Sequence, residues 1–214
     1  MSSNVYQTLE QRLTTVRMAP YFSACSGDQD ATLNLYAWNV KVSASLFADL
    51  SITEVVLRNA LDTALRNKYQ HGAFPRPWYE QVRLSPLGRA QVDQAVKFAT
   101  GPTQNDVVAQ LGFGFWKSLV SRTYQTTIWP VVRHCFLDDP DRQQAKRDGV
   151  YSLVDQLAFL RNRIAHHEPI FRRDLGRQHD ILLDLTGSIC QVTRVWVEEQ
   201  SDVPTLLTVK PHIV

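Results

Sequence analysis

One ten-residue segment holds most of the side chains that could do chemistry: residues 160–169, Leu-Arg-Asn-Arg-Ile-Ala-His-His-Glu-Pro. Histidine has the side-chain pKa nearest neutrality, so it can move protons at cellular pH. Arginine offers a fixed fork of donors that suits phosphate oxygens. An acid/base group beside an anion clamp is what cleavage of a phosphodiester requires, so this segment predicts phosphodiester chemistry.

The residues before this segment must position it. An apolar residue recurs at helical spacing, which predicts one amphipathic helix over about 144–166. On an ideal helix Arg161 and His166 would lie about 140° apart, too far for joint action. Pro169 disfavours the helical conformation at Glu168, so we expect the helix to loosen there and redirect the histidines. A second helix or a second subunit would also complete the site. The apolar stripe consists of Leu153, Leu157, Leu160 and Ile164.

Two other interpretations of the histidines stay open. A histidine or an arginine near a helix C-terminus can simply stabilise the helix dipole. Metal binding is disfavoured because His166, His167 and Glu168 are consecutive and cannot all face one ion, and no HExxH spacing or second ligand cluster exists. We therefore predict no metal and no cofactor.

A second polar group lies earlier in the chain. Residues 51–54, Ser-Ile-Thr-Glu, fit a capping box that opens a helix to about residue 69. Glu54 and Arg58 can then pair at i, i+4, a purely structural role. However, Arg58-Asn59 repeats the order of Arg161-Asn162, so we predict a shared pocket in which Glu54 orients an arginine.

Positive charge is concentrated around the motif, although the formal net charge of the chain is only +2. Such a small net charge does not by itself argue for nucleic acid. The local excess predicts supporting or RNA-binding roles for Arg163, Arg172 and Arg173, with a solvated helix face as the alternative. Between 161 and 177, Glu168 and Asp174 oppose Arg161, Arg163, Arg172, Arg173 and Arg177.

The remaining pattern is helical nearly throughout, so we predict one all-α domain over 1–214, with a motif-bearing core at about 30–200. Trp78, in the Gly- and Pro-containing break at 71–86, should pack down. Phe113, Phe115 and Trp116 should pack in the core. Tyr36, Trp38 and Asn39 could hold a base, although core packing is the commoner role. The tail at 206–209 alternates like a strand. Helices are predicted at 4–17, 30–48, 51–69, 86–99, 103–111, from about 116 to before Trp129, 144–166 and 174–199.

The bulk properties indicate a cytoplasmic protein. The apolar fraction is 44%, and no apolar run approaches the about 18 residues that a membrane span needs. The N-terminus lacks the basic and apolar regions of a signal peptide. Cys25, Cys135 and Cys190 are far apart, so neither a zinc knuckle nor a disulfide framework is indicated, and each is interpreted as a small buried hydrophobe.

Several ordered segments, spanning about residues 33–170, together resemble the Abi-like family of bacterial abortive-infection proteins within the HEPN superfamily. Residues 161–166 match that superfamily's Arg-x4–6-His signature. The other matching segments are Tyr36-x-Trp38-Asn39, Glu54-x3-Arg58-Asn59, the block at 112–116, and Ala165-His166-His167 after Arg161-Asn162.

The resemblance implies a HEPN-like helical bundle with additional helices, which dimerises with its motifs facing across a cleft. It also implies a metal-independent endoribonuclease toxin of phage defence, restrained by an antitoxin partner. Arg161 and His166 would take the catalytic positions and Asn162 the adjacent polar one, while His167 leaves open which imidazole acts. Glu54 and Arg58, with Asn59 next to them, would support the site. The alternative is a non-catalytic HEPN module that binds RNA or a protein partner.

Overall fold

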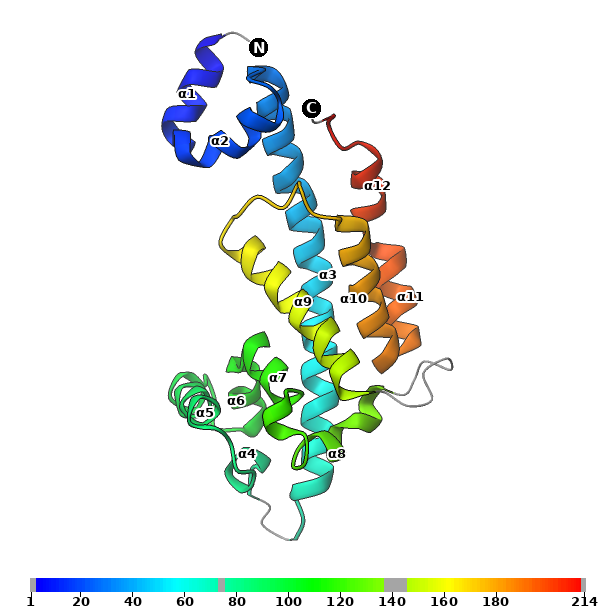
Figure 1. The fold of residues 1–214 in the computed structure, drawn as a ribbon. Helices are drawn as coiled ribbons and strands as arrows, with labels where there is room; N and C mark the ends of the chain where they lie inside the picture. Colours follow the sequence, from blue (N-terminus) through cyan, green and yellow to red (C-terminus); the bar gives the residue numbers. More distant parts are fainter. Residues whose placement is uncertain (1–2, 73–75, 137–145, 213–214) are drawn as a thin grey trace.

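A 41-residue helix, α3 (Gln29–Tyr69), is the axis of the molecule, and most of the other helices pack along it (Figure 1). The computed structural model describes residues 3–72, 76–136 and 146–212, and these contain helices and turns but no strand. The all-α prediction is therefore confirmed. No helix among the described residues is long and apolar enough to cross a membrane.

Helix α3 joins two helices that the sequence pattern predicts as separate. Asp28, not the expected Asp30, caps its N-terminus by accepting a hydrogen bond from Ala31 N at 2.8 Å. The predicted capping box at 51–54 is wrong: the Ser51 hydroxyl donates back to Phe47 O at 2.7 Å inside an unbroken helix. The helix continues through Ser51 because buried apolar residues recur at helical spacing on both sides of it. These residues include Leu35, Val42, Leu46, Leu50, Leu57, Leu61 and Leu65.

The N-terminal region is a pair of helices, α1 (Ser3–Leu13) and α2 (Thr15–Ala24), where one helix was predicted. Thr14 separates them with a left-handed φ of 74°, and its side chain accepts from Arg17 N. Tyr6, Met18 and Leu33 form a small core that holds this pair against α3.

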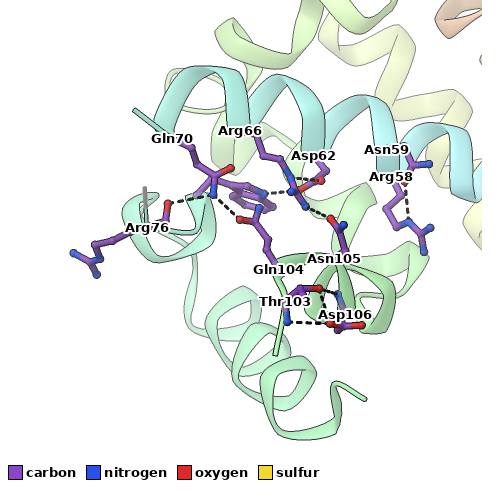
Figure 2. A network of polar contacts seen from close by, with 11 residues as sticks. Arg58, Asn59, Asp62, Arg66, Gln70, Arg76, Thr103, Gln104, Asn105 and Asp106 are labelled. Atoms are coloured by element: carbon purple, nitrogen blue, oxygen red, sulfur yellow. Dashed lines mark hydrogen bonds and ion pairs between the residues drawn. The ribbon is translucent and has the colours of Figure 1, made fainter. Parts of the chain in front are cut away.

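The middle of the chain folds into short helices around the C-terminal end of α3 (Figure 1). Trp78 is fully buried, as predicted, and its Nε1 donates to Asp62 Oδ1 at 2.7 Å. Arg66 joins the same carboxylate at 2.6 Å and donates to Asn105 Oδ1 at 2.8 Å, which ties α6 to α3 (Figure 2). The elements are α4 (Trp78–Gln81), α5 (Pro86–Phe98), α6 (Gln104–Gln110), α7 (Phe113–Leu119), η1 (Arg122–Tyr124), α8 (Trp129–Val132) and η2 (Arg133–Phe136).

Helix α9 (Arg147–Ala165) crosses α3 obliquely and carries the motif at its C-terminal end, while α10 (Leu175–Ile189) packs on α3 and α9 (Figure 1). The start predicted for α9, 144–145, lies outside the described residues. The chain then turns at Cys190 into α11 (Gln191–Gln200), so the single helix expected over 174–199 is two.

Three other predictions also need correction. The strand expected at 206–209 is wrong: residues 206–208 are the last residues of α12 (Val203–Thr208), and Val209 is the C-cap of this helix. A helix was expected to end before Trp129, but α8 begins there, with Pro130 in the first turn, where its missing N–H is not needed. Cys25 is buried as predicted, whereas Cys135 and Cys190 are only half-buried.

Candidate functional site

The motif helix ends in a tight left-handed turn that redirects the two histidines. Ala165 is the last helical residue, and His167 has a φ of 56°. His167 N donates to Ile164 O at 2.9 Å, and Glu168 N donates to Arg163 O at 2.8 Å. This pair of hydrogen bonds defines a Schellman turn with His167 at the position that glycine or asparagine usually fills. The expected loosening of the helix is therefore confirmed, and it begins before Glu168.

The Arg161 side chain extends from α9 toward α3, where it contacts Phe47 and Glu54, which are seven positions apart in the sequence. Its Nε lies 3.9 Å from Glu54 Oε2, and its guanidinium carbon lies 6.0 Å from the centroid of the Phe47 ring. The Arg161 side chain is 36% exposed, yet Nε is shielded from solvent and finds no hydrogen-bond acceptor among the described residues. Glu54 thus pairs with an arginine, as predicted, but the arginine belongs to α9. Arg58 donates through Nε to Asn59 Oδ1 at 3.3 Å (Figure 2).

A groove of about 820 Å³ opens beside Arg161 between α1–α2, α3 and the turn after α9. Phe47 lines this groove and also contacts Arg161, which does not itself line the groove. His167 and Glu168 line it from the turn. Arg17 donates through Nη1 to the His167 carbonyl, which fixes α2 against the turn and closes one side.

The groove is aromatic on its inner wall. The Tyr21 and Tyr36 rings meet edge to face with centroids 5.2 Å apart, and Tyr21 also packs on Phe171 at 4.9 Å. Burial raises the pKa of Tyr21 to about 12, and the neighbouring Tyr36 adds to this effect while Arg17 opposes it. The Tyr21 hydroxyl therefore stays protonated at neutral pH and can donate a hydrogen bond.

Asn162 and the second motif arginine face a different surface. Asn162 lines a smaller cavity of about 280 Å³ together with Lys117, Phe159 and Arg173. Arg163 and Arg173 both lie over the Phe159 ring, with their guanidinium carbons 5.8 and 4.7 Å from its centroid. The structure therefore separates Asn162 from the groove that His167 lines.

Other predicted site residues lie apart from the groove as well. His166 is exposed and caps α9 through its backbone N–H, which donates to Asn162 O at 2.9 Å. Arg172 is exposed, with its guanidinium carbon 5.5 Å from the Phe171 ring centroid. Asn59 lines a shallow pocket beside His134, formed by α3 and η2. The shared pocket predicted for the two Arg-Asn pairs is therefore wrong, because their asparagines line different surfaces.

Sequence reasoning missed the groove-lining residues Arg12, Arg17 and Phe47. One signal could have found Phe47: it precedes Glu54 by seven positions, which puts both on the same face of one helix. The break between two helices that we predicted at Ser51 concealed this relation. Arg12 and Arg17 carry no comparable signal, because their approach depends on how α1–α2 folds back.

Comparisons of the chain with protein-family models, with curated proteins and with solved structures found no significant match. The resemblance to the Abi-like family stays a prediction. Within the ranges that the structure describes, no group of three or more His, Cys, Asp and Glu side chains is arranged to hold a metal ion.

Proposed function

We propose that this protein is a metal-independent endoribonuclease of the abortive-infection toxin type, which cuts RNA by attack of the ribose 2′-OH. The observation that carries the proposal is the placement of Arg161. Glu54 and Phe47 contact its guanidinium group, and Phe47 also lines the groove that His167 lines. An arginine next to a groove that carries an imidazole supplies the two kinds of group that phosphodiester cleavage uses.

In this mechanism an imidazole accepts the proton of the 2′-OH and an imidazole protonates the leaving 5′ oxygen, each by general acid–base catalysis. Arg161 stabilises the negative charge that develops on the phosphorane. Because the attacking hydroxyl belongs to the substrate, the reaction is restricted to RNA. Both motif histidines are exposed, and His167 is the better placed of the two because it lines the groove and His166 does not.

A homodimer would complete this site. Asn162 faces away from the groove of its own chain, so a second copy is the means by which its amide could reach the reacting phosphate. We propose that two copies bring their motifs into one cleft, in the cytoplasm of a bacterial cell, where an antitoxin partner restrains activity until phage infection.

The test uses end-labelled RNA incubated with the protein in EDTA. We expect cleavage that leaves 2′,3′-cyclic phosphate ends and that Arg161→Ala abolishes. A matched control is Arg122→Ala, which removes an arginine outside both the groove and the Phe159 cavity. Absence of cleavage by the native protein, or equal loss in both variants, would exclude the assignment.

One observation favours a second function, a non-catalytic module that binds RNA. The Arg173 guanidinium carbon lies 4.7 Å from the centroid of the Phe159 ring, which is itself about half exposed, and the two side chains present a cationic aromatic surface away from the groove. Arginines of this kind bind phosphate without turnover, and their binding weakens as salt rises. Salt-dependent RNA binding that Arg173→Ala weakens, with no products in EDTA, would favour this function over cleavage.

A further inference from the structure

The groove between α1–α2, α3 and the turn after α9 combines features that suit one kind of ligand. Its volume of about 820 Å³ lies in the usual range for small-molecule sites, about 300–1,000 Å³. Two arginines, Arg12 and Arg17, line one end, and apolar side chains line the floor. A ligand that is flat and uncharged in one part and anionic in another would match both parts.

Two aromatic side chains that line the groove could contact the flat part of such a ligand. Phe47 is 38% exposed although it is a large apolar side chain, and Tyr36 is half-buried on the same face of α3. Aromatic side chains of this kind stack nucleobases without regard to sequence, because every base has a π face. Val40 lies between them along the helix and adds apolar contact area.

A buried amide gives the groove a polar contact. Asn39 is 4% exposed, and its Oδ1 accepts a hydrogen bond from Ile170 N at 2.9 Å. This bond orients the amide and leaves Nδ2 as the group that can donate to a ligand. The edges of bases carry oxygen and ring-nitrogen acceptors for such a donor.

The charge of the groove favours an anion. Glu168 is the one carboxylate among its lining residues, and Arg163 Nη1 pairs with Glu168 Oε2 at 3.0 Å. Arg12 is exposed, and Arg17 uses Nη1 for the His167 carbonyl, which leaves other donors of its guanidinium. Arginine donors in this arrangement suit phosphate.

We propose that this groove binds a single nucleotide, with the base against Phe47, the Asn39 amide as a hydrogen-bond donor further along the groove, and the phosphate at Arg12 and Arg17. Tyr36 lies about 16 Å along α3 from Phe47, so it lines the groove without stacking on the same base. The proposal rests on the proposed function, for which it supplies the subsite that holds one nucleotide of the RNA next to Arg161. The nucleotide can come from a strand of RNA or be free in solution.

Binding is measured by isothermal titration with two probes that the protein cannot cut, a 2′-O-methyl RNA octamer and 5′-AMP. Phe47→Ala should weaken binding by about tenfold, the loss expected for one stacked base, whereas Phe98→Ala, which removes a more exposed ring of α5, should change it less than about twofold. Arg12→Glu should weaken binding more than Lys97→Glu, which makes the same charge change on α5.

Because the binding of either probe is measured without cleavage, each outcome tests nucleotide binding by the groove separately from the ribonuclease activity. If both probes bind with this pattern, the groove accepts free nucleotides; if only the octamer binds, the ligand is an RNA strand. Absence of binding by both probes, or equal effects of the groove variants and their controls, overturns the proposal even where native RNA is still cut. Loss of cleavage in EDTA with intact groove binding overturns the proposed function instead. Circular dichroism melts confirm that each variant is folded.

Discussion

His167 occupies a backbone conformation that its side chain does not favour, and this allows its chemical role to be separated from its structural one. Its φ of 56° lies in the left-handed region, which costs an L-residue about 1–2 kcal/mol relative to glycine. Glycine also loses about 0.4–1 kcal/mol more backbone entropy on folding. The difference predicts that His167→Gly changes the free energy of unfolding by between about 0 and +1.6 kcal/mol, in the stabilising direction.

In a chain of this length 1 kcal/mol corresponds to about 2–4 °C in Tm. We therefore expect His167→Gly to melt at the native temperature or up to about 6 °C above it. His167→Val is the matched control, since a β-branched residue is strongly disfavoured at positive φ, and it should lower the Tm. Both variants lack the imidazole, so both should lose RNA cleavage in EDTA if His167 moves a proton in the reaction.

Two results would refute this reasoning separately. A Tm of His167→Gly more than about 3 °C below the native value would show that the left-handed turn is not the conformation glycine prefers there. Native cleavage rates in a well-folded His167→Gly would remove His167 from the mechanism and leave His166 as the remaining motif histidine, which His166→Ala then tests.

Three further predictions concern other parts of the molecule. Glu54→Gln removes a partly exposed partner of Arg161, so cleavage should fall severalfold while urea unfolding shifts by less than about 1 kcal/mol. Burial raises the pKa of the Asp49 carboxyl. Its stabilising contribution is present below the usual pKa of about 3.9 and is lost as pH rises through the raised value. Urea unfolding should therefore show Asp49→Asn gaining stability relative to the native protein as the pH rises above about 4. Trp78→Phe removes the 2.7 Å hydrogen bond to Asp62, which should cost about 1–3 kcal/mol and lower the Tm measured by calorimetry; an unchanged Tm would contradict this account.

Local periodicity was enough to predict the helical class and the motif helix. The stripe of Leu153, Leu157, Leu160 and Ile164 packs against or within the core, as its spacing predicts. Helix boundaries were less predictable because caps are weak local signals. At Ser51 a good capping pattern is overridden by the burial of α3 on both sides of it, and the hydroxyl bonds within the helix instead.

The sequence by itself determined which chemistry-bearing residues the chain has, and that they cluster at the end of one helix. Only the tertiary structure decided which of them meet. Glu54 and Phe47 meet Arg161 because α9 crosses α3 there, and Arg17 reaches the His167 carbonyl because α2 folds back. Such contacts depend on the crossing of helices far apart in the chain, which periodicity within one helix does not encode. Asn162, the residue next to Arg161, lines a different cavity.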